Sequence, residues 1–197
     1  GIVFNFNYEL DGSTENPISI INIKQDINIT ACFEKSEFVI FSSIEDGNEG
    51  GIITPLGSTT VKNGNDQKYD IKANEGYSIE QIVIDDQEQD ILNNNYSFEY
   101  IFSNVKADHV VTVSFIKEYS VIFKVNTEDK PNGIIEGEIN QSVVKGSDCT
   151  SVTAVPDEGF VFDKWSNGLT DNPLILTNIT EDMEISAIFT WWGQPET

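Results

Sequence analysis

The chain has 197 residues, with 33 acidic residues against 11 lysines and no arginine, and its formal net charge is −22. This acidic excess argues against nucleic acid and anionic lipid as partners, because both are bound through basic side chains. No apolar run is long enough to cross a membrane, so direct membrane insertion is not expected.

Residues 1–35 match a later part of the chain without a gap. A shift of 160 − 4 = 156 positions places Phe4 on Phe160 and Phe33 on Phe189. This first copy contains only the C-terminal part of the unit, so we expect an incomplete repeat from a longer array. Its matching residues are Phe4, Phe6, Asn16, Pro17, Asn22, Asp26, Ile29, Ala31 and Phe33.

Residues 36–117 form a second copy, which ends at Phe115, 115 − 33 = 82 positions after Phe33. An extra segment of roughly nine residues between Asp85 and Asn95 maps to a loop, where insertions in repeats usually fall. Alternating apolar and polar residues predict its strands. These are Val39 and Phe41, Gly51 to Thr54, Tyr69 to Ala73, Tyr77 and Ile79, Ile82 to Ile84, Ser97 to Phe102 and Val111 to Phe115.

Residues 118–190 form a third copy, which ends 189 − 115 = 74 positions later at Phe189. Its predicted strands lie around Tyr119 to Val125, Ile134 to Ile139, Val143 to Val144, Thr150 to Ala154, Phe160 to Trp165, Leu174 to Leu176 and Ile185 to Phe189. The residues after it, 191–197, are predicted to be a tail.

The second and third copies also match upstream of their shared endings. We align Phe41 with Phe123, Gly64 with Gly146 and Ile71 with Val152.

The pattern predicts an all-β chain of tandem small modules, each with a β-sandwich-like fold, because no sustained helical period is present. Four residues separate Phe33 from Phe38, and three separate Phe115 from Tyr119. Connections this short favour an elongated, semi-rigid arrangement of modules.

Groups suited to catalysis are sparse. His109 is the one histidine, and Cys32 and Cys149 lie at unequal positions of different copies, so both are expected to be free thiols. The acidic runs 45–51 and 85–90 could offer oxygen ligands to calcium, but neither has EF-hand spacing and both are expected to be solvated loops. We therefore predict no enzyme, no metal site and no cofactor.

The three tryptophans fall into two classes. Trp165 lies in a phenylalanine-rich segment and is expected in a core. Trp191 and Trp192 follow the last expected strand. They would either cap the open end of the third module or stack on a sugar or a protein partner, and they are the ligand-binding candidates.

The third copy contains Gly-Ile-Ile from Gly133, Val-Thr-Ala-Val-Pro-Asp-Glu-Gly-Phe-Val-Phe-Asp-Lys-Trp-Ser-Asn-Gly from Val152, and Ile-Ser-Ala-Ile-Phe ending at Phe189. This pattern resembles the divergent branch of the internalin-type B-repeats, and the second copy resembles a variant without the tryptophan. The resemblance covers nearly the whole chain except 190–197. In the first copy Glu9 falls where Trp165 would be, so Tyr8 or Leu10 should supply that apolar residue.

The resemblance implies a secreted or surface-anchored bacterial protein and a β-grasp-like fold as the alternative to a sandwich, with no catalytic residues. We therefore expect a non-catalytic structural spacer or adhesin segment, located outside the bacterial cell. The alternative function is a module that binds a carbohydrate or a host protein. Expected partners are neighbouring repeats of the chain and a host or neighbouring-cell protein or glycan.

Overall fold

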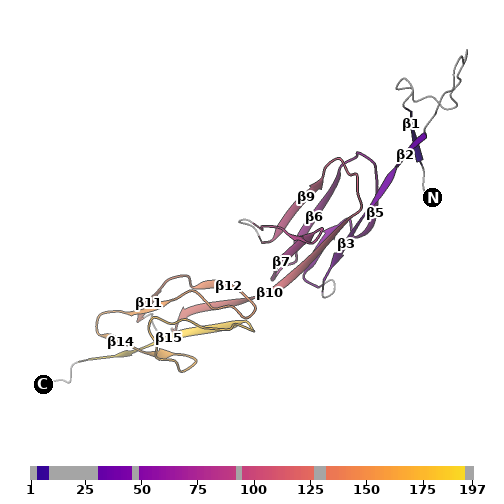
Figure 1. Cartoon of the computed structure of the whole chain (residues 1–197). Coiled ribbons are helices and arrows are strands. Elements are labelled where there is room, and N and C mark those ends of the chain that lie inside the picture. Colours follow the sequence, from indigo (N-terminus) through magenta and orange to yellow (C-terminus); the bar gives the residue numbers. More distant parts are fainter. Residues whose placement is uncertain (1–3, 9–30, 46–48, 92–94, 127–131, 194–197) are drawn as a thin grey trace, which may run out of the picture. The chain divides into compact units, whose positions relative to one another are not determined.

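The computed structural model describes residues 4–8, 31–45, 49–91, 95–126 and 132–193, with side chains from Glu34 onward. These ranges contain β-strands and no helix, so the prediction of an all-β fold is confirmed (Figure 1). A β-grasp fold packs a helix on its sheet, whereas both layers seen in the described ranges are made of strands. The same ranges accordingly hold no candidate membrane-spanning helix.

The strands are numbered in chain order. They are β1 (Phe4–Tyr8), β2 (Ala31–Lys35), β3 (Glu37–Ile44), β4 (Gly51–Thr54), β5 (Gly57–Lys62), β6 (Gln67–Ala73), β7 (Tyr77–Ile84), β8 (Gln87–Glu88), β9 (Ser97–Phe102), β10 (His109–Val125), β11 (Gly133–Glu136), β12 (Asn140–Val144), β13 (Thr153–Pro156), β14 (Phe160–Trp165) and β15 (Met183–Trp191).

In the first copy, β1 and β2 form an antiparallel hairpin whose register pairs Tyr8 with Ala31. In the third copy, β14 and β15 are antiparallel and pair Trp165 with Ala187, with a bulge just before Lys164. Because 187 − 31 = 156, Ala31 and Ala187 are equivalent positions. The register therefore makes Tyr8 the equivalent of Trp165. The bulge adds one residue to β14 but not to β1, so an alignment without gaps places Glu9 at the position of Trp165 instead.

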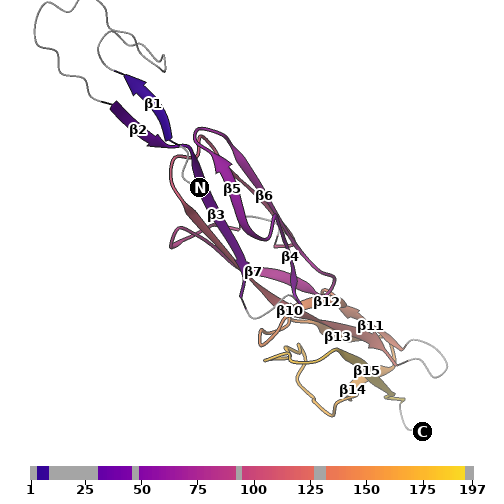
Figure 2. The same cartoon turned by 90° about the vertical axis from the view of Figure 1, so that its right-hand side faces the viewer.

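The second copy consists of two sheets. β3 lies antiparallel to β5 and parallel to β10, while β7 pairs with both β10 and β8 (Figure 2). The other sheet has the order β4-β6-β9. Alternate residues of both sheets are buried, as expected for two layers that enclose one core. The buried apolar residues include Ile40, Ile53, Val61, Tyr69, Ile71, Ile82, Phe102, Val111 and Val113.

The third copy follows the same plan. β15 lies parallel to the later part of β10 and antiparallel to β14, β12 pairs with β10, and β11 pairs with β13. Its core contains Trp165, which is 0% exposed, packed against Phe123 with ring centroids 6.0 Å apart. Burial of large side chains such as these is the main favourable contribution to folding. The remaining buried members are Val121, Val143, Cys149, Val152, Ala154, Leu174, Leu176, Ile179, Ile185 and Ala187.

The strand registers correct the alignment of the first strands by one residue. Ile40 lies opposite His109 in the second copy, and Val121 lies opposite Met183 in the third. His109 and Met183 are equivalent, since 183 − 109 = 74, so Ile40 is equivalent to Val121. The alignment of Phe41 with Phe123 is therefore wrong. A shift of one residue exchanges the two faces of a strand, which is why Phe41 is exposed and Phe123 is buried.

The same backbone hydrogen bonds recur in the two fuller copies, which shows that they share one framework. Each pair below has its donor and acceptor at equivalent positions. In the second copy these bonds run from Gly64 N–H to Val105 O, from Val105 N–H to Asn65 O, from Glu45 N–H to Val113 O and from Glu118 N–H to Gly76 O. In the third copy they run, in the same order, from Gly146 N–H to Ile179 O, from Ile179 N–H to Ser147 O, from Asn126 N–H to Ala187 O and from Trp192 N–H to Gly159 O.

A second correction concerns the counterpart of β9. Tyr69 pairs with Tyr100 in β9, and Val152 makes an isolated bridge with Leu174, where 174 − 100 = 74. Tyr69 is thus equivalent to Val152, so the alignment of Ile71 with Val152 is wrong by two residues. The third copy has no strand at this place in its described residues. Instead the Asn172 side chain donates to Ala154 O and accepts from Ala154 N–H, which reproduces a strand ladder with one amide group.

The chain divides into two compact units. The first contains the described residues of 1–48, 52–72 and 81–114. The second contains those of 115–197 together with 49–51 and 73–80, two segments of the second copy that include the first residue of β4 and the first half of β7.

Candidate functional site

One loop is built alike in both fuller copies, at Asn104 and Asn178. Both residues have a left-handed backbone, with φ of 53° and 54°, which asparagine tolerates better than most residues. The aspartate four positions later accepts a backbone N–H of the first strand. Asp108 Oδ1 accepts from Val39 at 2.8 Å, and Asp182 Oδ1 accepts from Ser120 at 2.9 Å. The loop thus fastens the end of each module to its beginning.

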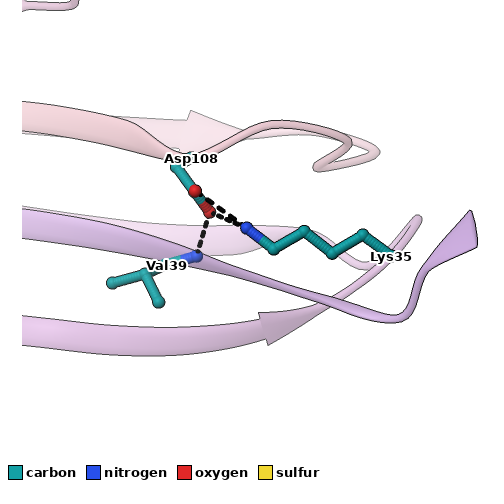
Figure 3. A network of polar contacts seen from close by, with 3 residues as sticks. All are labelled: Lys35, Val39 and Asp108. Carbon is teal, nitrogen blue, oxygen red and sulfur yellow. Dashed lines mark hydrogen bonds and ion pairs between the residues drawn. The ribbon is translucent and has the colours of Figure 1, made fainter. Parts of the chain in front are cut away.

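In the second copy this aspartate also binds a lysine. Lys35 Nζ lies 2.9 and 2.8 Å from the two carboxylate oxygens of Asp108, next to the Val39 bond (Figure 3). The Lys35 ammonium and the Val39 N–H together hold the pKa of Asp108 below its usual value. Lys35 ends β2, so this ion pair connects the first hairpin with the second copy. Both groups are well exposed, which keeps the contribution of the pair small.

His109 is engaged in a structural contact. Its Nδ1 lies 2.6 Å from Asp85 Oδ2, and its ring packs on Phe102 with centroids 4.6 Å apart. Asp85 Oδ1 also accepts the N–H of Val110 at 2.9 Å. The inserted segment of the second copy is therefore fastened to β10 through Asp85. Neither this pairing nor the one between Lys35 and Asp108 could be predicted, because each joins residues far apart in the sequence.

The acidic runs do not come together as a metal site in the described part of the chain. Asp85 and Asp86 occupy a left-handed turn before β8, with φ of 48° and 62°. No group of three or more His, Cys, Asp or Glu side chains that could hold a metal ion occurs among the described residues. Residues 46–48 of the other run lie outside the described ranges.

The two cysteines belong to different copies, Cys32 to the first and Cys149 to the third. Cys149 is a free thiol in the core of the third copy, and burial raises its pKa. The expectation of a free thiol is confirmed for Cys149. The side chain of Cys32 lies outside the described residues.

Both fuller copies carry a shallow hollow at equivalent positions. The one in the second copy has a volume of about 390 Å³ and includes Ile101, Asn104 and His109. The one in the third has a volume of about 340 Å³ and includes Ile175, Asn178 and Met183. The polar linings differ, since Lys106 and Ala107 are replaced by Thr180 and Glu181.

The candidate pair Trp191 and Trp192 lies at the end of the third copy. Trp191 is the last residue of β15 and pairs with Phe160, so the prediction that it follows the strand is wrong. Its ring meets Phe160 edge to face at 5.2 Å and covers Gly159, where an added Cβ would lie 2.6 Å from Trp191 Cζ3. Trp191 and Trp192 are 68% and 73% exposed, more than any other large apolar side chain described.

A comparison with protein-family models matches residues 123–191 to the divergent InlB B-repeat domain. The third copy is therefore similar to this B-repeat domain over nearly all of its length. Domains of this kind are typical of bacterial surface proteins. No curated protein and no solved structure matches the chain. The match begins at Phe123 in β10 and ends on Trp191, so the B-repeat domain as matched includes one of the two candidate tryptophans.

Proposed function

We propose that the chain is a non-catalytic spacer segment of a bacterial surface or secreted protein, in which the second copy is a B-repeat-type module like the third. One observation carries this proposal. The two copies share the groups that hold the fold, namely the Asn–Asp loops and the backbone hydrogen bonds, and differ at exposed positions. Exposed pairs that differ are Lys106 and Thr180, Ala107 and Glu181, and Lys117 and Trp191.

A spacer needs a fold that repeats, whereas a binding site that acted in every copy would need the same exposed chemistry in every copy. The hollows at Asn104 and Asn178 fail that requirement, because their polar linings differ. The acidic charge fits a soluble protein outside the cell, where mutual repulsion limits association.

Binding arrays test the proposal directly. The purified chain should bind no glycan on a glycan array and no host surface protein on a protein array at micromolar concentration. A specific ligand that binds equally well to the wild-type chain and to a variant with Trp191→Ala and Trp192→Ala would contradict the spacer role.

The second candidate is a carbohydrate- or host-protein-binding module that uses Trp191 and Trp192. Their exposure favours it, because large exposed aromatic side chains are common in interfaces. In this case the same arrays should reveal a ligand that the double alanine variant loses. A matched Trp165→Phe variant, altered in the core only, should keep it.

A further inference from the structure

The first and last strands of each fuller copy lie side by side and run parallel. In the second copy, residues 40–44 of β3 pair with residues 109–113 of β10. In the third copy, residues 121–125 of β10 pair with residues 183–187 of β15 (Figure 1). The chain enters each copy through the first of these strands and leaves it through the second. The two strands that continue into the neighbouring chain are therefore hydrogen-bonded directly to each other.

Each parallel ladder is extended by one hydrogen bond at both of its ends. At the start, the aspartate of the Asn–Asp loop, Asp108 or Asp182, accepts the backbone N–H that precedes the ladder. At the other end, the residue after the first strand donates its N–H to the last strand. These bonds run from Glu45 N–H to Val113 O at 2.8 Å and from Asn126 N–H to Ala187 O at 2.9 Å. In the third copy an ion pair between Lys124 and Glu184 also joins the two strands.

Tension along the chain acts on these two strands in a defined direction. Because they run parallel, force at the start of the first strand and at the end of the last strand acts in opposite directions along their shared axis. The strands must then slide past each other, and the hydrogen bonds between them are stretched together. A single hydrogen bond contributes little net stability, so the number of bonds that must break at once decides the resistance. Strands pulled apart from the same end would instead lose their bonds one after another.

We propose that each fuller copy is a tension-resisting module, in which the parallel pairing of its first and last strands opposes force transmitted along the chain. The force passes directly from one of these strands to the other, and the remaining strands of the copy are pulled only after this ladder breaks. The inference rests on the proposed spacer function for the source of the tension, because a spacer that connects two bodies is stretched when they move apart.

Single-molecule force spectroscopy with optical tweezers tests the proposal on the whole chain. One protein serves for two pulling geometries. It carries a short peptide tag at each end and an azide-bearing amino acid in place of Glu181, an exposed residue just before the ladder of the third copy. In the first geometry the handles are attached to the two tags. In the second, the C-terminal handle is attached at position 181 instead. The stability of the chain is the same in both, because the molecule is the same.

The two geometries differ only in how the third copy is pulled. End-to-end pulling makes the paired strands of both copies slide. Pulling at position 181 separates the strands of the third copy from their common starting end, so its ladder opens bond by bond. The second copy is pulled as before and is the internal control. The third copy is recognised by its released length, which is shorter by 191 − 181 = 10 residues in the second geometry.

The proposal predicts that the rupture force of the third copy falls at least about twofold in the second geometry, because its bonds then break in sequence. The rupture force of the second copy should stay unchanged. An equal rupture force of the third copy in both geometries would overturn the proposal, because the resistance would then come from the core. A fall of the same size in the second copy would also overturn it. A ligand found on the arrays would remove the spacer role and leave this comparison of forces intact.

Discussion

The second and third copies fill the same framework with different side chains. The second places Tyr69 and Phe102 on its β6–β9 layer, opposite Ile82, which is 0% exposed. The third places Trp165 where the second has Ile82, since 165 − 82 = 83 equals 160 − 77 for the residues that begin these strands. It has the smaller Val152 and Leu176 opposite.

In this exchange the largest side chain lies on one layer in the second copy and on the other layer in the third. A close-packed interior tolerates such redistribution as long as the total volume and the pattern of buried positions are kept. The tryptophan is therefore one solution to the packing problem of this repeat. A copy without it can keep the same hydrogen-bond framework.

The largest test of this comparison is a crossed set of core truncations. Trp165→Ala should cost about 3–5 kcal/mol, more than Val152→Ala in the same copy, because it leaves the larger cavity. In the second copy the order should reverse, with Tyr69→Ala costing more than Ile82→Ala. Guanidinium unfolding monitored by NMR signals of each copy measures all four. Equal costs for Trp165→Ala and Val152→Ala would break the comparison.

A smaller effect is expected from Asn172→Ala, which should cost about 1–3 kcal/mol because it leaves the N–H and C=O of Ala154 without their partners. The second copy makes the equivalent contacts with the backbone of β9, between Ile71 and Phe98. Asn167→Ala is the matched control, since Asn167 makes one exposed bond to Leu169. Equal losses for the two variants, in thermal unfolding, would contradict the role of Asn172 as a strand substitute.

Glycine substitutions compare the turns that precede β7 and β14. Gly76 and Gly159 have φ of 76° and 85°, so an alanine at either position should cost about 1–2 kcal/mol in backbone strain. Only at Gly159 would the new Cβ also meet the Trp191 ring. Gly159→Ala should therefore shift the indole NMR signal of Trp191, and Gly76→Ala should leave it in place. An unmoved Trp191 signal in both variants would contradict the described contact.

The smallest expected effect is on the stability of the second copy at low pH. The pKa of Asp108 is lowered in the folded chain, so its contribution is complete above the unfolded value of about 4 and is lost as the pH falls through the folded value. Asp108→Asn should flatten the decline in stability of the second copy as the pH falls below about 4. Urea unfolding over that range measures it, with Asp182→Asn as the matched variant in the third copy. An unchanged slope for Asp108→Asn would refute the contribution.

The sequence predicted most of the strands and the repeat, because both depend on local alternation and on glycine and asparagine turns such as Gly64 and Asn104. It missed β5, and it placed a strand at Leu174 to Leu176, where the structure has one isolated bridge at Leu174. The alignment made from the sequence failed in the first strand of each copy. Phe41 and Phe123 look equivalent in the sequence, but the strand register places their side chains on opposite faces. It also failed where a side chain replaces a strand, although Asn16 and Asn172 recur and could have drawn attention to that position. The partners of Lys35 and His109 depend on tertiary contacts over 73 and 24 residues, which no local pattern contains. At the candidate site, the sequence identified Trp191 and Trp192 but not the end of the strand that carries them.

Amide hydrogen exchange by NMR tests most directly whether the two copies share one framework. The account predicts similar protection within each of the pairs Val39 and Ser120, Gly64 and Gly146, and Asn104 and Asn178, whose N–H groups donate to equivalent acceptors. Strong protection of these amides in the third copy, with free exchange of their counterparts in the second, would contradict it.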